Sequence, residues 1–124
     1  MLQYALTPAL AHAVLTKVAT YVAKQLEPRI RRKRVNQLGG LQFDSDMRAL
    51  ASFFAVRSGR RIRARFARLL QMAQLLTLES PAEVLEYWGP NAGVVPWELS
   101  AEEVRSTLAL RTDFSPQDVM RLRL

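Results

Sequence analysis

The 124-residue sequence contains no cysteine and a single histidine, and both shortages exclude a class of chemistry. Without thiols the chain forms no disulfide and has no thiolate nucleophile, and one histidine cannot complete a Cys/His zinc cluster. Glycine and proline are also scarce, at five and six residues, whereas 49% of the residues are hydrophobic. This balance is typical of a chain that folds around a core, and the length suits one domain of roughly 100–200 residues.

Long hydrophobic runs are missing too. No uninterrupted apolar segment approaches the roughly 18 residues that span a bilayer, and residues 1–15 lack the basic start of a secretory signal. We therefore expect a soluble chain that reaches membranes only peripherally.

The net charge of +7 is unevenly distributed. Residues 1–68 carry fourteen Lys or Arg and three acids, whereas residues 69–124 carry four Arg and eight acids. The basic half suits nucleic acid, anionic lipid or an acidic protein surface, while the acidic half argues against a chain built wholly for DNA. The candidate contacts for an anionic surface are Arg29, Arg31, Arg32, Lys33, Arg34, Arg60 and Arg61.

Apolar residues recur at helical spacing through the first two thirds of the chain. The spacing predicts a first helix from Pro8 to about Leu26, which Pro28 ends or kinks because proline lacks an amide donor. The pair Gly39-Gly40 is a candidate boundary. A second helix is expected from a cap at Asp44 to about residue 57, and a third over residues 60–78.

Three later segments share a helix-start signature, a serine followed three residues later by a carboxylate. In such a capping box each side chain accepts a hydrogen bond from the other residue's amide. The pairs Ser80/Glu83, Ser100/Glu103 and Ser115/Asp118 predict short helices at 81–88, 101–111 and 116–122. Because Val94-Val95 is the only extended-looking pair, the expected fold is an all-α bundle of short helices.

Aromatic residues cluster around the segment YWGPNAG. Gly89 can adopt the left-handed conformation that closes a helix, and Pro90 forbids continuation. Tyr87, Trp88 and Trp97 then have two interpretations. They either pin a long connection onto the bundle or form an aromatic partner surface.

No arrangement of residues indicates catalysis. His12 stands alone, the carboxylate pairs fit caps and solvated helix faces, and the glycines form no phosphate-binding motif. We expect no enzyme activity, no cofactor and no metal.

The last 59 residues carry an ordered series of motifs: FARLLQMAQLLTLE from Phe66, EVLEYWGPNAG, AEEVRSTLALRTDF and a terminal RLRL. This series resembles the C-terminus of subunit 4 of the conserved oligomeric Golgi complex, and LGGLQFD at 38–44 extends the likeness. The resemblance implies the C-terminal part of a helical-rod tethering subunit. Residues 1–43 would be the tail of a preceding helical domain and 44–124 the terminal bundle.

The resemblance also implies a function. A subunit of this family helps to capture vesicles in retrograde transport within the Golgi, through non-covalent contacts with the other subunits and with SNARE machinery, at the cytosolic face of the membrane. Family subunits are several times longer, so the chain is expected to be a C-terminal piece. Two alternatives stay open: a basic helical module that binds nucleic acid, and one that binds anionic membranes. Nucleic acid is the less favoured partner because no DNA- or RNA-binding motif is present.

Arg68 is the charged residue with the clearest expected partner. It lies at the flank of the apolar arc of its helix, where a guanidinium is partly desolvated and needs a carboxylate. The resemblance implies that this arginine of FARL lies close to the glutamate of the AEEVR segment, which is Glu103. We expect a structural salt bridge whose loss costs about 3–5 kcal/mol if the pair is buried.

Overall fold

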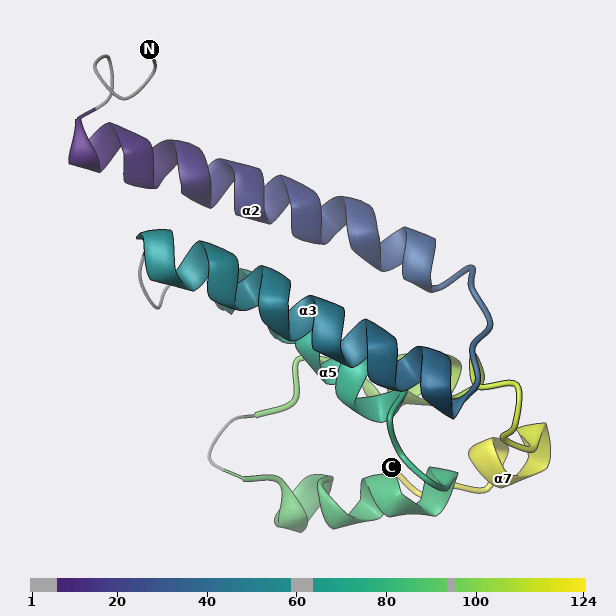
Figure 1. Cartoon of the computed structure of the whole chain (residues 1–124). Coiled ribbons are helices and arrows are strands. Elements are labelled where there is room, and N and C mark those ends of the chain that lie inside the picture. The colour runs from purple at the N-terminus through teal and green to yellow at the C-terminus, as the bar shows by residue number, and fades with distance from the viewer. Residues whose placement is uncertain (1–6, 59–63, 94–95) are drawn as a thin grey trace.

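The computed structural model describes residues 7–58, 64–93 and 96–124 (Figure 1). Within these ranges the chain forms helices and no β-strand, which confirms the all-α prediction. Val94-Val95 lies outside the described residues. The elements, in order, are α2 (Pro8–Ile30), α3 (Gln37–Ser58), η1 (Ala64–Phe66), α5 (Ala67–Leu75), η2 (Pro81–Glu86), η3 (Gly89–Asn91), α6 (Ala101–Leu108) and α7 (Pro116–Met120), where η marks a 3₁₀ helix.

The two long helices form one layer of the molecule. Figure 1 shows α2 and α3 side by side and running in opposite directions, with α5 packed beneath α3. The shorter elements lie on the other side of α5, where α6 packs on α5 and α7 packs on η2. Helix α5 is therefore the central element of the fold.

Helix α2 is longer than its sequence predicts. The Thr7 hydroxyl caps its start by accepting a hydrogen bond from the Leu10 amide at 3.1 Å. The predicted end near Leu26 was wrong, because Pro28 lies inside the helix. A proline so close to a helix end removes only one of the last hydrogen bonds, and the Arg31 amide still donates to the Glu27 carbonyl.

Helix α3 also begins earlier than predicted, and the boundary at Gly39-Gly40 was wrong. Both glycines lie in its first turn, and the Asn36 side chain caps the helix by accepting from the Gly39 amide at 2.8 Å. Asp44 is not a cap. It pairs instead with Arg48 one turn later, at 3.0 Å. The division of the chain at residue 43 stays a prediction, and it falls within this continuous helix.

Gly40 is buried for a packing reason. A Cβ atom at this position would lie 1.8 Å from the carbonyl oxygen of Leu76, which is far inside van der Waals contact. Only glycine lets the start of α3 approach the end of α5 so closely. The glycine pair therefore serves a helix contact and not a chain break.

The predicted third helix, residues 60–78, is only partly described, and its start lies outside the described residues. Its described part consists of the single turn η1 and then α5, which buries Leu69, Met72, Ala73 and Leu75. Phe66 stacks on Phe54 of α3 with ring centroids 5.6 Å apart. These side chains anchor the core, which also includes Met47, Ala51, Val84, Leu99, Val104, Leu108, Phe114, Val119 and Leu122.

The three predicted capping boxes have different outcomes. Ser100 and Glu103 form a complete box at the start of α6. Ser80 makes no such bond, because the Glu83 carboxylate accepts instead from the Glu79 amide, and the following turn is a 3₁₀ helix that ends at Glu86. Ser115 donates to the Gln117 side chain, and α7 is only five residues long.

Candidate interaction site

Four charged side chains from three helices meet beside α5. Arg68 of α5 donates from Nε to Glu27 of α2 at 2.8 Å and from Nη2 to Glu103 of α6. Arg31, just after α2, pairs with Glu103 at 3.3 Å and with Glu27 at 3.7 Å. We call Glu27, Arg31, Arg68 and Glu103 the ion cluster. Its alternating charges join the end of α2 to α5 and α6.

Glu103 serves two structures at once. One carboxylate oxygen accepts from the Ser100 amide at 3.1 Å and completes the cap of α6, while the other faces Arg68 and Arg31. The hydrogen bond from Arg68, followed by that from the Ser100 amide, lowers the pKa of Glu103 to about 2. The carboxylates raise the pKa of Arg68, Glu27 most and Glu103 next.

Both partners of the expected salt bridge are partly exposed to solvent. The Arg68 side chain is 38% exposed and the Glu103 side chain is 33% exposed. Water screens a pair of this kind, so the cost of 3–5 kcal/mol that applies to a buried pair is too large here. We expect about 1 kcal/mol from Glu103 at neutral pH.

The lowered pKa predicts a pH dependence of stability. Because the folded-state pKa of Glu103 lies below its ordinary value of 4.5, its contribution is present above about pH 4.5 and is lost as the pH falls toward 2. Glu103→Gln should therefore unfold more easily than the wild type at pH 6, by about 1 kcal/mol, and by less than half of that at pH 2.5, where the pH approaches the folded-state pKa of Glu103. Glutamine can keep the capping hydrogen bond from the Ser100 amide, so the comparison measures the effect of the carboxylate charge alone.

Denaturant unfolding at the two pH values measures this difference. The matched control is Glu102→Gln, because Glu102 is exposed on the same helix and its described contacts include no ion pair. An equal loss for Glu103→Gln at pH 6 and pH 2.5 would show that the carboxylate charge does not stabilise the fold.

A second arginine, Arg111, is completely buried. Its Nη1 donates to the carbonyl oxygens of Leu76 and Leu78 at 3.1 and 2.6 Å, and its Nε and Nη2 donate to Asp113 at 2.8 and 2.7 Å. The guanidinium also lies 4.0 Å from the ring centroid of Phe114. Hydrogen bonds from Arg111 lower the pKa of Asp113.

The backbone around Arg111 also hydrogen-bonds to the connection between α2 and α3. The Val35 amide donates to the Leu110 carbonyl at 2.9 Å, and the Thr112 amide donates to the Val35 carbonyl at 2.8 Å. Val35 and Arg111 thus form an isolated parallel bridge between the α2–α3 connection and the segment after α6. Because residues 110–112 make this bridge, α6 ends at Leu108 and not at the predicted residue 111.

Sequence reasoning singled out Arg68 and Glu103 but missed Glu27 and Arg111. Glu27 could have been noticed as the only acid of the first 43 residues, set among seven cations. The signal for Arg111 is its place in LALRTDF, where an arginine directly follows three apolar residues and stands two positions before an aspartate.

The predicted aromatic surface is largely turned inward. The Trp97 indole donates to the Tyr87 carbonyl at 2.7 Å, and the rings of Trp88 and Trp97 lie 5.5 Å apart. Both tryptophans are half-buried against the core. Gly89 has the predicted left-handed conformation, with φ of +61°, but its predicted place at a helix end was wrong, because η2 ends at Glu86 and Gly89 begins η3. Tyr87, 40% exposed, retains the most open surface of the three, and a role in partner binding stays a prediction.

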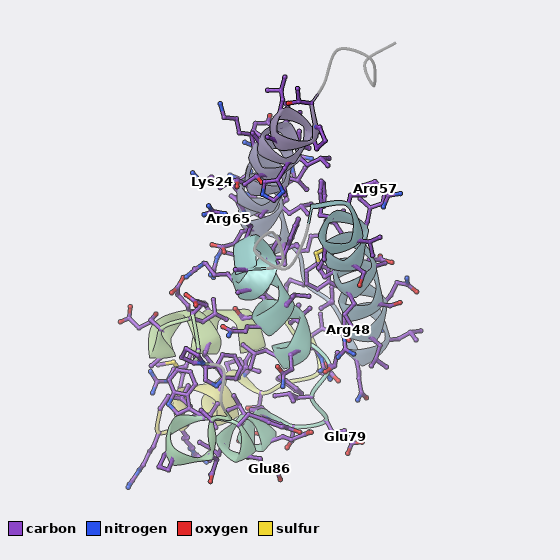
Figure 2. All side chains as sticks on the ribbon, turned by 90° about the vertical axis from the view of Figure 1, so that its left-hand side faces the viewer. Lys24, Arg48, Arg57, Arg65, Glu79 and Glu86 are labelled. Carbon is purple, nitrogen blue, oxygen red and sulfur yellow. The ribbon has the colours of Figure 1, made fainter. Side chains whose placement is uncertain are left out.

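Five of the seven predicted basic residues lie around the end of α2. Arg29, Arg32, Lys33 and Arg34 are exposed around the end of α2, whereas Arg31 belongs to the ion cluster. Arg60 and Arg61 lie outside the described residues. Figure 2 shows other cations on two sides of the molecule, Lys24 and Arg65 on one and Arg48 and Arg57 on the other, with Glu79 and Glu86 at the far end.

Membrane spans and metal sites are both missing from the described part of the chain. Residues 7–58, 64–93 and 96–124 contain no helix with the length and apolar character of a membrane span. The same ranges contain no group of three or more His, Asp or Glu side chains that could hold a metal ion.

Known proteins match both the sequence and the terminal motifs. The family described as conserved oligomeric Golgi complex subunit 4, C-terminal, matches residues 1–106. The subunit 4 protein of Homo sapiens is 44% identical over 119 residues, which are 96% of this chain and 15% of the relative. The chain belongs to the subunit 4 family of the conserved oligomeric Golgi complex.

The likeness extends across distant subunit 4 relatives. The protein of Arabidopsis thaliana is 45% identical over 107 residues, which are 86% of this chain and 14% of the relative. That of Caenorhabditis elegans is 30% identical over 105 residues, which are 82% of this chain and 13% of the relative. The chain thus spans about a seventh of the length of these subunit 4 relatives.

Proposed function

We propose that the chain acts as the C-terminal part of a Golgi vesicle-tethering subunit and serves retrograde transport within the Golgi. The observation that carries the proposal is the match of 96% of the chain to the human subunit 4 protein at 44% identity. Its partners are the other subunits of the complex and SNARE machinery. It works at the cytosolic face of the Golgi membrane as a peripheral protein.

The described geometry supports a role through contacts and not through catalysis. The ion cluster and Arg111 use their charges to join helices, and the carboxylate of Glu103 is held ionised by its partners. A tethering subunit needs a fixed arrangement of helices that presents its surfaces to other proteins. Tyr87 and the exposed cations near Arg29 are candidate contact residues on such a scaffold.

Co-purification tests this function. An affinity-tagged form of the chain is expressed in cells, and proteins recovered with it are identified by mass spectrometry. Recovery of other Golgi complex subunits is the expected result. Arg111→Met serves as the control, because an unfolded chain should recover them less.

The two rival functions make different predictions for the same purified chain. A salt-dependent mobility shift with DNA or RNA, without recovery of Golgi subunits, would replace the proposal with a nucleic-acid-binding module. Flotation with anionic liposomes, again without recovered subunits, would replace it with a membrane-binding module.

A further inference from the structure

A basic groove lies between α2 and η1. It is lined by Thr16, Lys17, Thr20, Tyr21, Lys24 and Arg65 and has a volume of about 380 Å³. Three of these six residues carry a positive charge and none carries a negative charge. In Figure 2, Lys24 and Arg65 project on the same side of the molecule although they come from different elements.

The chain supplies no carboxylate to these cations. All eleven Asp and Glu residues lie within the described ranges. Their ion pairs there involve Arg31, Arg48, Arg68 and Arg111, and none involves Lys17, Lys24 or Arg65. Three cations that share a concave site without a counter-charge repel one another, and an anionic ligand would relieve that repulsion.

A second groove of about 410 Å³ adjoins the first and shares Thr20, Lys24 and Arg65 with it. It contains two carboxylates, Glu27 and Glu98. Glu27 is engaged by Arg68 and Arg31, and Glu98 is exposed at the opposite wall beside α5. Neither carboxylate lines the first groove, which is therefore the more basic part of the combined groove.

The shape of the site and its neighbours favour a peptide over a membrane. Tyr21 is 65% exposed beside the groove, and Val14 and Val18 continue an exposed apolar line along α2. Lys17 and Lys24 stand two helical turns apart, about 10 Å along the axis. An acidic amphipathic helix matches this pattern, with carboxylates at a seven-residue spacing and apolar side chains beside them. The exposed apolar line lacks the Trp or Phe that interfacial membrane helices commonly carry.

We infer that the groove formed by Lys17, Tyr21, Lys24 and Arg65 is a docking site for an acidic amphipathic helix of a partner protein. None of the residues that line this groove belongs to the ion cluster or to the aromatic loop, and the inference goes beyond the proposed function. Its existence is tested with the purified chain and does not depend on assembly of a Golgi complex.

Fluorescence anisotropy with a defined probe tests the inference. The probe is a labelled helical peptide of about 18 residues with one leucine face and glutamates at a seven-residue spacing, and the control probe has glutamines in their place. The site variant carries Lys17→Glu, Lys24→Glu and Arg65→Glu. The matched variant carries Arg57→Glu, Arg121→Glu and Arg123→Glu, which are exposed and outside the groove. Both variants have the net charge +7 − 6 = +1.

We expect the site variant to bind the acidic peptide at least about tenfold more weakly than the wild type, and the matched variant to lose about threefold or less. Circular dichroism confirms that both variants fold. Equal losses in the two variants would assign binding to net charge and overturn the inference, as would an absence of binding by the wild type. Groove-dependent flotation with vesicles of phosphatidylcholine and phosphatidylserine, stronger than peptide binding, would overturn it in favour of a lipid surface.

Discussion

Replacing Gly40 with alanine is expected to lower the free energy of unfolding by about 3 kcal/mol or more. The added Cβ would lie 1.8 Å from the Leu76 carbonyl oxygen and 2.7 Å from its carbon, so the overlap is with backbone. That carbonyl is held in place by the buried Arg111, 3.1 Å away. Neither α3 nor the end of α5 can yield without breaking this contact. The gain in helix propensity of about 1 kcal/mol does not offset such a clash.

Gly39→Ala is the matched control for this experiment. It makes the same change one residue earlier in the same helix, where the nearest atoms to a new Cβ are side-chain atoms of Val35 and Asn36 at 3.3 and 3.4 Å. We expect its stability to stay within about 1 kcal/mol of the wild type, because side chains can adjust. Urea unfolding of the two variants measures the contrast. Equal stabilities would mean that α3 and α5 do not meet as closely as described.

Arg111→Met should destabilise the fold by about 3–5 kcal/mol. Methionine fills much of the volume of the arginine stem but donates no hydrogen bonds. The carbonyl oxygens of Leu76 and Leu78 would then lose their donor in a buried site. Because Leu76 and Leu78 follow directly after α5, the loss should loosen the contacts of α5 with both α3 and α6.

Lysine at position 111 separates charge from geometry. Its ammonium keeps the positive charge but cannot span Asp113 and two carbonyls as a planar guanidinium does. We expect Arg111→Lys to cost about 2 kcal/mol, between the wild type and Arg111→Met. Arg121→Met is the control, since Arg121 is exposed after α7. Its replacement should change the free energy of unfolding by less than about 0.5 kcal/mol. If thermal or urea unfolding shows the same loss of stability for Arg111→Met as for Arg121→Met, the role assigned to Arg111 is contradicted.

The features that the sequence predicts correctly depend on residues close together in the chain. The Ser100/Glu103 capping box and the left-handed Gly89 are set by neighbours within a few residues. The all-α class follows from apolar spacing repeated along the chain. The pairing of Arg68 with Glu103, 35 residues apart, was expected from the family resemblance and not from local pattern.

The features that sequence reasoning missed depend on contacts between distant segments. Gly40 looks like a chain break until Leu76, 36 residues later, is known to lie against it. Pro28 looks like a helix end, yet the helix continues to Ile30. Arg31 reads as one cation of a basic run, but Glu27 and Glu103 engage it. For Gly40 and Arg31 the neighbour in a distant segment decides the role, and local propensity cannot supply it.

The most direct test of the proposed function replaces the matching region of the human subunit 4 protein with this chain. The chimera is expressed with an affinity tag in cells that lack the human subunit, and co-purified Golgi complex subunits are quantified. We predict recovery close to that of the unaltered human protein, and much lower recovery when the chimera also carries Gly40→Ala. A stable, folded chimera that recovers none of the other subunits would contradict the proposal that this chain acts as the C-terminal part of a tethering subunit.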